Sequence, residues 1–114
     1  MFNLVITEHA NLRLQERVPF LRFKEYKSVA LNAFSLHDCR PISDKFLCDY
    51  LDYLESEHYQ NEIRFASIWK DYIFIFSKRC GFKENNIYLR TVYHIDRDTV
   101  LKHAIYTALK GSKY

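Results

Sequence analysis

The sequence predicts an α+β fold in which two helices come first, an antiparallel sheet of three to four strands follows, and a last helix ends the chain. Apolar residues recur every three to four positions between residues 7 and 37, as on one face of a helix. Aromatic and β-branched residues then dominate residues 63–95. With 114 residues, of which 48% are hydrophobic and 17% aromatic, the chain fits a single domain over residues 1–114.

The first elements follow from caps and from four-residue spacing. Residues 3–6 suit a short edge strand or an extended lead-in, and Thr7 can cap a helix that Pro19 ends. Its core face carries three residues four positions apart: Ala10, Leu14 and Val18. A second helix is expected over residues 22–37, before the helix-breaking pair Arg40-Pro41.

Residues 44–58 fit two patterns. One helical face would carry Leu47, Tyr50, Leu51 and Leu54, whereas Phe46, Cys48, Tyr50 and Leu54 partly fit the alternation of a strand. Four acidic residues on the opposite face favour the helix: Asp49, Asp52, Glu55 and Glu57. We therefore prefer a helix with a solvated acidic face.

The second half of the chain predicts a meander and a last helix. Residues 63–69 and 72–77 are strands around a hairpin turn at Lys70-Asp71, and residues 87–95 form the third strand. Asp98 can cap a final helix that Gly111 ends.

Composition excludes several classes of protein. Only 2 glycines are present, which excludes glycine-rich phosphate loops. No apolar run approaches a membrane span and the start lacks the layout of a signal peptide, so we expect a cytoplasmic protein with no membrane association. The 3 cysteines form no C-x-x-C pair and the 5 histidines are scattered, so we expect neither a metal site nor a cofactor.

Charge is unevenly distributed along the chain. Residues 1–40 carry a net charge of +2 and residues 65–114 a net charge of +5, whereas residues 41–64 carry −4. The basic ends are suited to a polyanion such as RNA, and the acidic 44–62 segment is suited to a protein partner. A solvated surface that only keeps the domain soluble is an equally good explanation of both.

The first helix carries the constellation that suits chemistry. His9, Arg13 and Arg17 recur every four residues and so fall within about 80° of one another, along the border between core and solvent. A histidine can transfer protons near neutral pH, and arginines stabilise negative charge on a phosphate. The alternative is a solvated face in which Arg13 pairs with Glu16.

The stretch from Thr7 to Arg17, TEHANLRLQER, together with Thr91-Val92 in the last strand, carries a resemblance. It is similar to a family of small bacterial and phage domains with a His-Ala, Arg, Arg helix, which itself resembles the barnase–EndoU–colicin–RelE superfamily. That resemblance implies N-terminal helices on a curved antiparallel sheet and, in many members, metal-independent cleavage of RNA. Where the family commonly has Gly after the second Arg, this chain has Val18.

The resemblance implies a site formed by His9, Arg13 and Arg17 on one wall and Thr91 on the last strand. Strict alternation along that strand places Leu89, Thr91 and Tyr93 on one face, so Tyr93 joins the site and His94 points elsewhere unless a bulge intervenes. Three further basic residues could bind RNA: Lys78, Arg79 and Arg90. Trp69, Tyr72, Phe74 and Phe76 could stack bases but fit a core equally well, and Cys80 beside two cations fits an inert thiol.

The sequence thus leads to two hypotheses on function, beside the alternative of a purely structural or oligomerising domain. The first is a small metal-independent endoribonuclease of the toxin type. The second is a non-catalytic phage-type protein that binds and inhibits a host protein or RNA.

Overall fold

The computed structural model describes residues 3–35, 40–42, 45–55, 62–79 and 85–111. It confirms the α+β class. In chain order the elements are β1 (Asn3–Ile6), α1 (Glu8–Arg17), the 3₁₀ turn η1 (Phe23–Glu25), α2 (Tyr26–Ser35), β2 (Arg40–Ile42), α3 (Lys45–Glu55), β3 (Glu62–Trp69), β4 (Tyr72–Arg79), β5 (Asn86–His94) and α4 (Thr99–Gly111).

One mixed sheet of five strands runs through the middle of the molecule, in the order β1-β5-β4-β3-β2. The predicted meander β3–β4–β5 is antiparallel, and β1 is an edge strand that runs parallel to β5. The other edge is β2, which the sequence did not indicate because Arg40-Pro41 was interpreted as the end of a helix. An edge strand tolerates Pro41 because an edge leaves backbone groups without a neighbouring strand.

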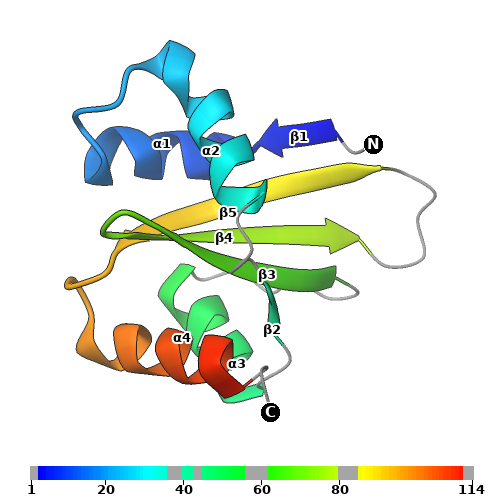
Figure 1. Ribbon diagram of the computed structural model, residues 1–114, viewed down its shortest axis with the longest axis vertical. Helices are drawn as coiled ribbons and strands as arrows, with labels where there is room; N and C mark the ends of the chain where they lie inside the picture. Colours follow the sequence, from blue (N-terminus) through cyan, green and yellow to red (C-terminus); the bar gives the residue numbers. More distant parts are fainter. Residues whose placement is uncertain (1–2, 36–39, 43–44, 56–61, 80–84, 112–114) are drawn as a thin grey trace.

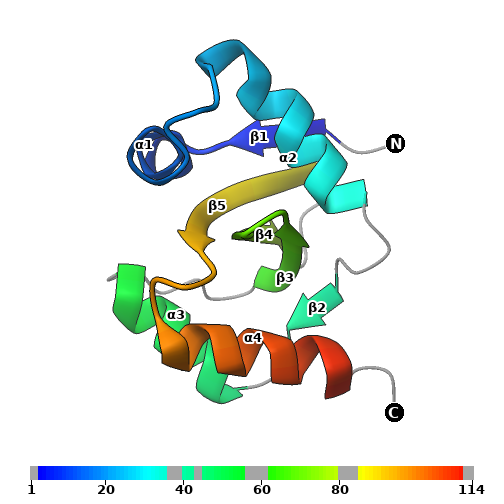
Figure 2. The same ribbon diagram turned by 60° about the vertical axis from the view of Figure 1, so that its left-hand side comes forward.

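Helices cover both faces of this sheet. Figures 1 and 2 show α1 and α2 on one side of it and α3 and α4 on the other. The central strand β4 is therefore buried on both faces over residues 72–77. Tyr72, Phe74 and Phe76 belong to the core below α1 and α2, and Ile73 and Ile75 to the core below α3 and α4. Three of the four aromatic residues that could have stacked bases are thus core residues.

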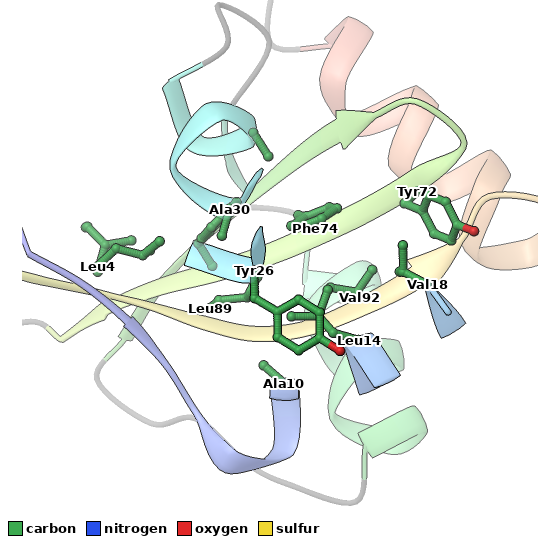
Figure 3. Close-up of a cluster of buried hydrophobic side chains, with 13 residues drawn as sticks. Leu4, Ala10, Leu14, Val18, Tyr26, Ala30, Tyr72, Phe74, Leu89 and Val92 are labelled. Carbon is green, nitrogen blue, oxygen red and sulfur yellow. The ribbon is translucent and has the colours of Figure 1, made fainter. Parts of the chain in front are cut away.

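The first helix forms for the reasons that its sequence indicates. The Thr7 hydroxyl accepts a hydrogen bond from the Ala10 amide, which caps the helix, and Val18 follows its last residue. Ala10, Leu14 and Val18 are fully buried, and Figure 3 shows Leu14 and Val18 directed at β5 and β4 beside Val92 and Tyr72.

Other predicted elements are confirmed with small changes in their bounds. The expected helix over 22–37 consists of η1 and α2, which ends at Ser35, and residues 45–55 of the ambiguous 44–58 segment are helical. Lys70 has a positive φ of 53° in the β3–β4 turn. Asp98 caps α4 by accepting hydrogen bonds from the amides of Val100 and Leu101. None of the helices in the described ranges is long and apolar enough to cross a membrane.

A β-bulge changes which face each residue of β5 occupies. Phe76 pairs with Leu89 and Ile75 pairs with Thr91, so Arg90 is the extra residue on β5. Strict alternation predicts Leu89 on the same face as Thr91, and that prediction is wrong. The bulge places Leu89 in the core below α1 and leaves Thr91 opposite Ile75, whose side chain belongs to the core below α3 and α4.

Candidate functional site

The site lies at the edge of the sheet, where the edge strand β1 ends and α1 runs alongside the rest of β5. β1 pairs with β5 only as far as Leu89. There the chain turns at Thr7, whose amide and hydroxyl both donate to the Leu89 carbonyl, at 3.3 and 3.0 Å. Figure 1 shows α1 continuing from β1 alongside the rest of β5. Farther along, Nη1 of Arg17 donates to the Val92 carbonyl at 2.7 Å.

All five residues predicted to be catalytic meet at a carboxylate that the sequence analysis did not single out. Glu55, the last residue of α3, accepts hydrogen bonds from Nε2 of His9, from the Tyr93 hydroxyl and from the Thr91 hydroxyl, the last at 2.8 Å. Nε of Arg13 and Nη1 of Arg17 each lie 3.6 Å from a carboxylate oxygen. We call this group the Glu55 cluster: His9, Arg13, Arg17, Glu55, Thr91 and Tyr93.

The position of Glu55 corrects the prediction of a solvated acidic face. Leu47 and Leu51 are buried, and Glu55 continues their four-residue spacing on the same stripe of α3. A carboxylate on a buried stripe needs partners, and this spacing is the signal that could have found it. Asp52 also turns inward, to pair with Arg64, whereas Asp49 is exposed. Glu57 lies outside the described residues.

Exposure decreases from the surface of the cluster to its centre. The side chains of His9 and Arg13 are 25% and 26% exposed, that of Arg17 is 10% exposed and that of Glu55 only 3%. A ligand arriving from solvent would therefore meet the imidazole and a guanidinium first. The buried Glu55 carboxylate contacts both the His9 ring and the Arg13 guanidinium from the interior side and so fixes their positions.

The hydrogen bonds around Glu55 fix the protonation of two groups. Burial alone would raise the pKa of Glu55, but hydrogen bonds from Tyr93, Thr91 and His9 outweigh it and hold the pKa below its ordinary value. Burial, followed by the hydrogen bond to Glu55, raises the pKa of Tyr93 well above its ordinary value. At neutral pH the cluster thus contains a carboxylate anion and a neutral phenol that donates to it.

The cluster has more positive than negative charge. Arg13 and Arg17 face one buried carboxylate, and among the described residues the only further anion in contact with them is Glu16, which binds Nη1 of Arg13 at the surface at 2.9 Å. Burial, and next the charge of the exposed Arg97, lower the pKa of Arg17. The Nε atoms of Arg13 and Arg17 are buried without a hydrogen-bond partner among the described residues. An added anion would therefore be stabilised here.

Of the residues predicted to bind RNA, Lys78 and Arg79 lie at the end of β4, and Arg90 is the bulge residue next to Thr91 in β5. Arg90 forms an ion pair with Glu62, donates from Nε to Ser77 at 2.7 Å, and lies 4.9 Å from the centre of the Tyr88 ring. The guanidinium of Arg79 lies 5.0 Å from the same ring, and Lys78 is exposed. We call Glu62, Ser77, Tyr88 and Arg90 the Glu62 cluster.

The remaining candidates do not join the site. The His94 ring packs edge-on against Tyr72 at 5.1 Å, and its Nδ1 accepts a hydrogen bond from the Asp96 amide. Cys80 lies outside the described residues. Within the ranges that the structure describes, no three His, Cys, Asp or Glu side chains are grouped so as to hold a metal ion.

Comparison with known proteins identifies no relative of this chain. The chain matches no protein-family model, no curated protein and no solved structure. Its function must therefore be argued from the Glu55 cluster itself.

Proposed function

We propose that this chain is a metal-independent endoribonuclease-like domain whose reaction centre is the Glu55 cluster. One observation carries the proposal: a partly exposed imidazole is held by a buried, ionised carboxylate beside two arginines whose charge that carboxylate does not fully balance. This arrangement supplies a proton acceptor and a site for a phosphate in the same few ångströms.

His9 is the proton-transfer group of the proposed reaction. Nε2 of the ring donates to Glu55, so Nδ1 is the nitrogen that faces the substrate. It takes the proton from a ribose 2′-hydroxyl while the 2′-oxygen attacks phosphorus. The bond from phosphorus to the 5′-oxygen breaks, that oxygen receives a proton from the imidazolium or from water, and a 2′,3′-cyclic phosphate remains. Glu55 fixes the ring tautomer and stabilises the imidazolium while it exists.

Arg13 and Arg17 stabilise the charge that grows on the phosphoryl oxygens. Arg13 is the more exposed of the two and contacts the phosphate first, whereas Arg17 is tied to the Val92 carbonyl and acts from behind. Thr91 and Tyr93 were predicted among the catalytic residues, but the hydroxyl of each donates its hydrogen bond to Glu55. In this proposal they are positioning residues.

The test is cleavage of RNA by the purified protein in the presence of EDTA. We expect products that end in a 2′,3′-cyclic phosphate, and a loss of about 10²- to 10⁴-fold in rate for His9→Ala. His103→Ala is the matched control, because His103 is exposed on α4, across the sheet from the helix α1 that carries His9 (Figure 1). A wild-type protein that leaves RNA intact, or a His9→Ala variant as active as the wild type, would defeat the proposal.

The alternative of an interaction protein depended on an acidic surface over residues 44–62. Asp52 and Glu55 direct their charges at Arg64 and at the Glu55 cluster, and Glu62 directs its charge at Arg90. Three of the acidic side chains in that segment are therefore neutralised within the molecule, which favours the ribonuclease hypothesis.

A further inference from the structure

A group of aromatic side chains, of which Phe20 is exposed and Trp69 is half-buried, lies at the end of the sheet where β3 turns into β4. The Phe20 ring stacks on Trp69, with centroids 6.4 Å apart and an angle of 19° between the planes, and it also contacts Tyr72 at 6.0 Å. The Phe20 side chain is 56% exposed. Nζ of Lys70 lies 4.9 Å from the centre of the Trp69 ring and 5.9 Å from that of Phe20. We call Phe20, Trp69 and Lys70 the aromatic platform.

The local sequence explains why these rings reach solvent. Pro19 ends α1 and carries the chain past Val18, which lies against Tyr72 in Figure 3, so that Phe20 rests on the outside of this core. Lys70 adopts a left-handed conformation, φ 53°, that Gly or Asn adopts at lower cost. Lys70 thus places a cation in the turn at a position where Gly or Asn would suit the positive φ better.

The platform lies near the end of α1 that carries Arg17 of the Glu55 cluster. Phe20 follows Arg17 by three residues, and Tyr72, which Phe20 contacts, packs against His94, the neighbour of Tyr93. In Figure 1 the end of α1, the β3–β4 turn and the end of β5 lie on the same side of the molecule. Arg97, whose charge acts on Arg17, also belongs to this end. Lys70 and Arg97 are exposed cations at this end, where Asp71 and Asp96 are exposed anions.

We propose that the aromatic platform binds an unpaired base of single-stranded RNA that flanks the phosphate bound at the Glu55 cluster. The inference rests on the proposed function and names its substrate class. An exposed aromatic face accepts any base by stacking, and a cation beside it attracts the phosphate of the same nucleotide. A duplex is excluded as the preferred substrate because its bases are already stacked on one another.

Trp69 is the only tryptophan in the sequence, so its fluorescence reports on the platform directly. The probe is a short single-stranded 2′-O-methyl RNA, which lacks the 2′-hydroxyl nucleophile and is not cleaved. We expect quenching on titration and an affinity about 5- to 100-fold lower for Phe20→Ala, the cost of one lost base stack. Phe23→Ala is the matched control, since Phe23 is 73% exposed outside the platform.

A second variant tests the cation without disturbing the fold. Lys70→Gly suits the positive φ, so the hairpin is retained while the charge is removed. We expect weaker binding and a flatter dependence of the logarithm of the affinity on that of salt concentration, by about 0.7 for one phosphate contact. Unchanged affinity and salt dependence in this variant would overturn the role given to Lys70.

The outcomes separate this inference from the proposed function. Quenching that Phe20→Ala weakens supports the platform, even if unmodified RNA stays intact and the nuclease proposal fails. Absence of quenching, equal affinity of Phe20→Ala and wild type, or equal affinity for a duplex of the same length would overturn it. Each of these results stands whether or not the protein cleaves RNA.

Discussion

Two buried polar clusters lie on the same face of the sheet, and they differ in charge balance and in access to solvent. In the Glu62 cluster and its neighbour Asp52–Arg64, each carboxylate is matched by an arginine, and the arginine side chains are only 15% and 5% exposed. In the Glu55 cluster one carboxylate faces two arginines and a histidine, and His9 and Arg13 are about a quarter exposed.

We interpret this difference in charge balance and exposure as a difference in role: the Glu62 cluster stabilises the fold, and the Glu55 cluster is the proposed reaction centre. A matched ion pair, whether between two strands as for Glu62 and Arg90 or between a helix and a strand as for Asp52 and Arg64, gives each of the two charges a counterion. A cluster with surplus cations and a reachable imidazole would be stabilised by an added anion. The surplus is therefore the reason that we propose the Glu55 cluster, and not the Glu62 cluster, as the site of function.

The largest expected effect is on cleavage. Glu55→Gln keeps the size of the side chain but removes the charge that stabilises an imidazolium at His9, so we expect the rate to fall by about 10²-fold or more. Glu62→Gln removes the same charge from the Glu62 cluster and should leave the rate within about twofold, as fits a residue away from the chemistry. Equal losses in the two variants, measured under single-turnover conditions, would show that the clusters do not differ in function.

The sequence could predict the α1 side of the Glu55 cluster but not its centre. His9, Arg13 and Arg17 follow from a local spacing of four residues, which any helix places on one side. Glu55 reaches them from α3 only because α3 packs on the opposite face of the sheet and ends beside β5. That contact joins residues 46 positions apart and depends on tertiary packing, which no local pattern encodes.

The prediction for β5 succeeded in part for a similar reason. Thr91 and Tyr93 do share a face, since they are two residues apart beyond the bulge. The bulge at Arg90 arises from pairing with β4, and strict alternation cannot anticipate it. In the same way β2 pairs three residues with β3 and is too short to show a period of its own.

The next largest effect is on stability. Arg64→Met removes the cation that pairs with the largely buried Asp52, and we expect the free energy of unfolding to fall by about 3 kcal/mol. Arg13→Met should cost less than about 1 kcal/mol, because Glu55 keeps its contacts with His9, Arg17, Thr91 and Tyr93. Urea unfolding at neutral pH measures both. A larger loss for Arg13→Met would mean that the surplus cation stabilises the fold.

A smaller effect is expected from acid. The pKa of Glu55 is lowered in the folded protein, so its contribution to stability is complete above the ordinary value of 4.5 and is lost as the pH falls through the lowered pKa. Unfolding curves from neutral pH to about pH 3 should therefore bring the wild type and Glu55→Gln closer together at the acidic end. A difference in the free energy of unfolding between the two proteins that stays constant with pH would contradict the lowered pKa of Glu55.

The smallest effect is expected at the rim of the Glu55 cluster. Glu16 is 56% exposed and binds Arg13 three residues away, a contact worth about 0.2–0.5 kcal/mol. Because it is also the surface anion that competes with a phosphate for Arg13, Glu16→Gln should tighten binding of the 2′-O-methyl RNA at low salt, and added salt should reduce that gain. Asp49 pairs with the exposed Lys45 within α3, so Asp49→Asn, which removes an anion from another exposed ion pair, is the control. An equal gain in both variants would show that the RNA responds to net charge alone, whereas a gain confined to Glu16→Gln identifies Arg13 as the cation that first contacts the phosphate.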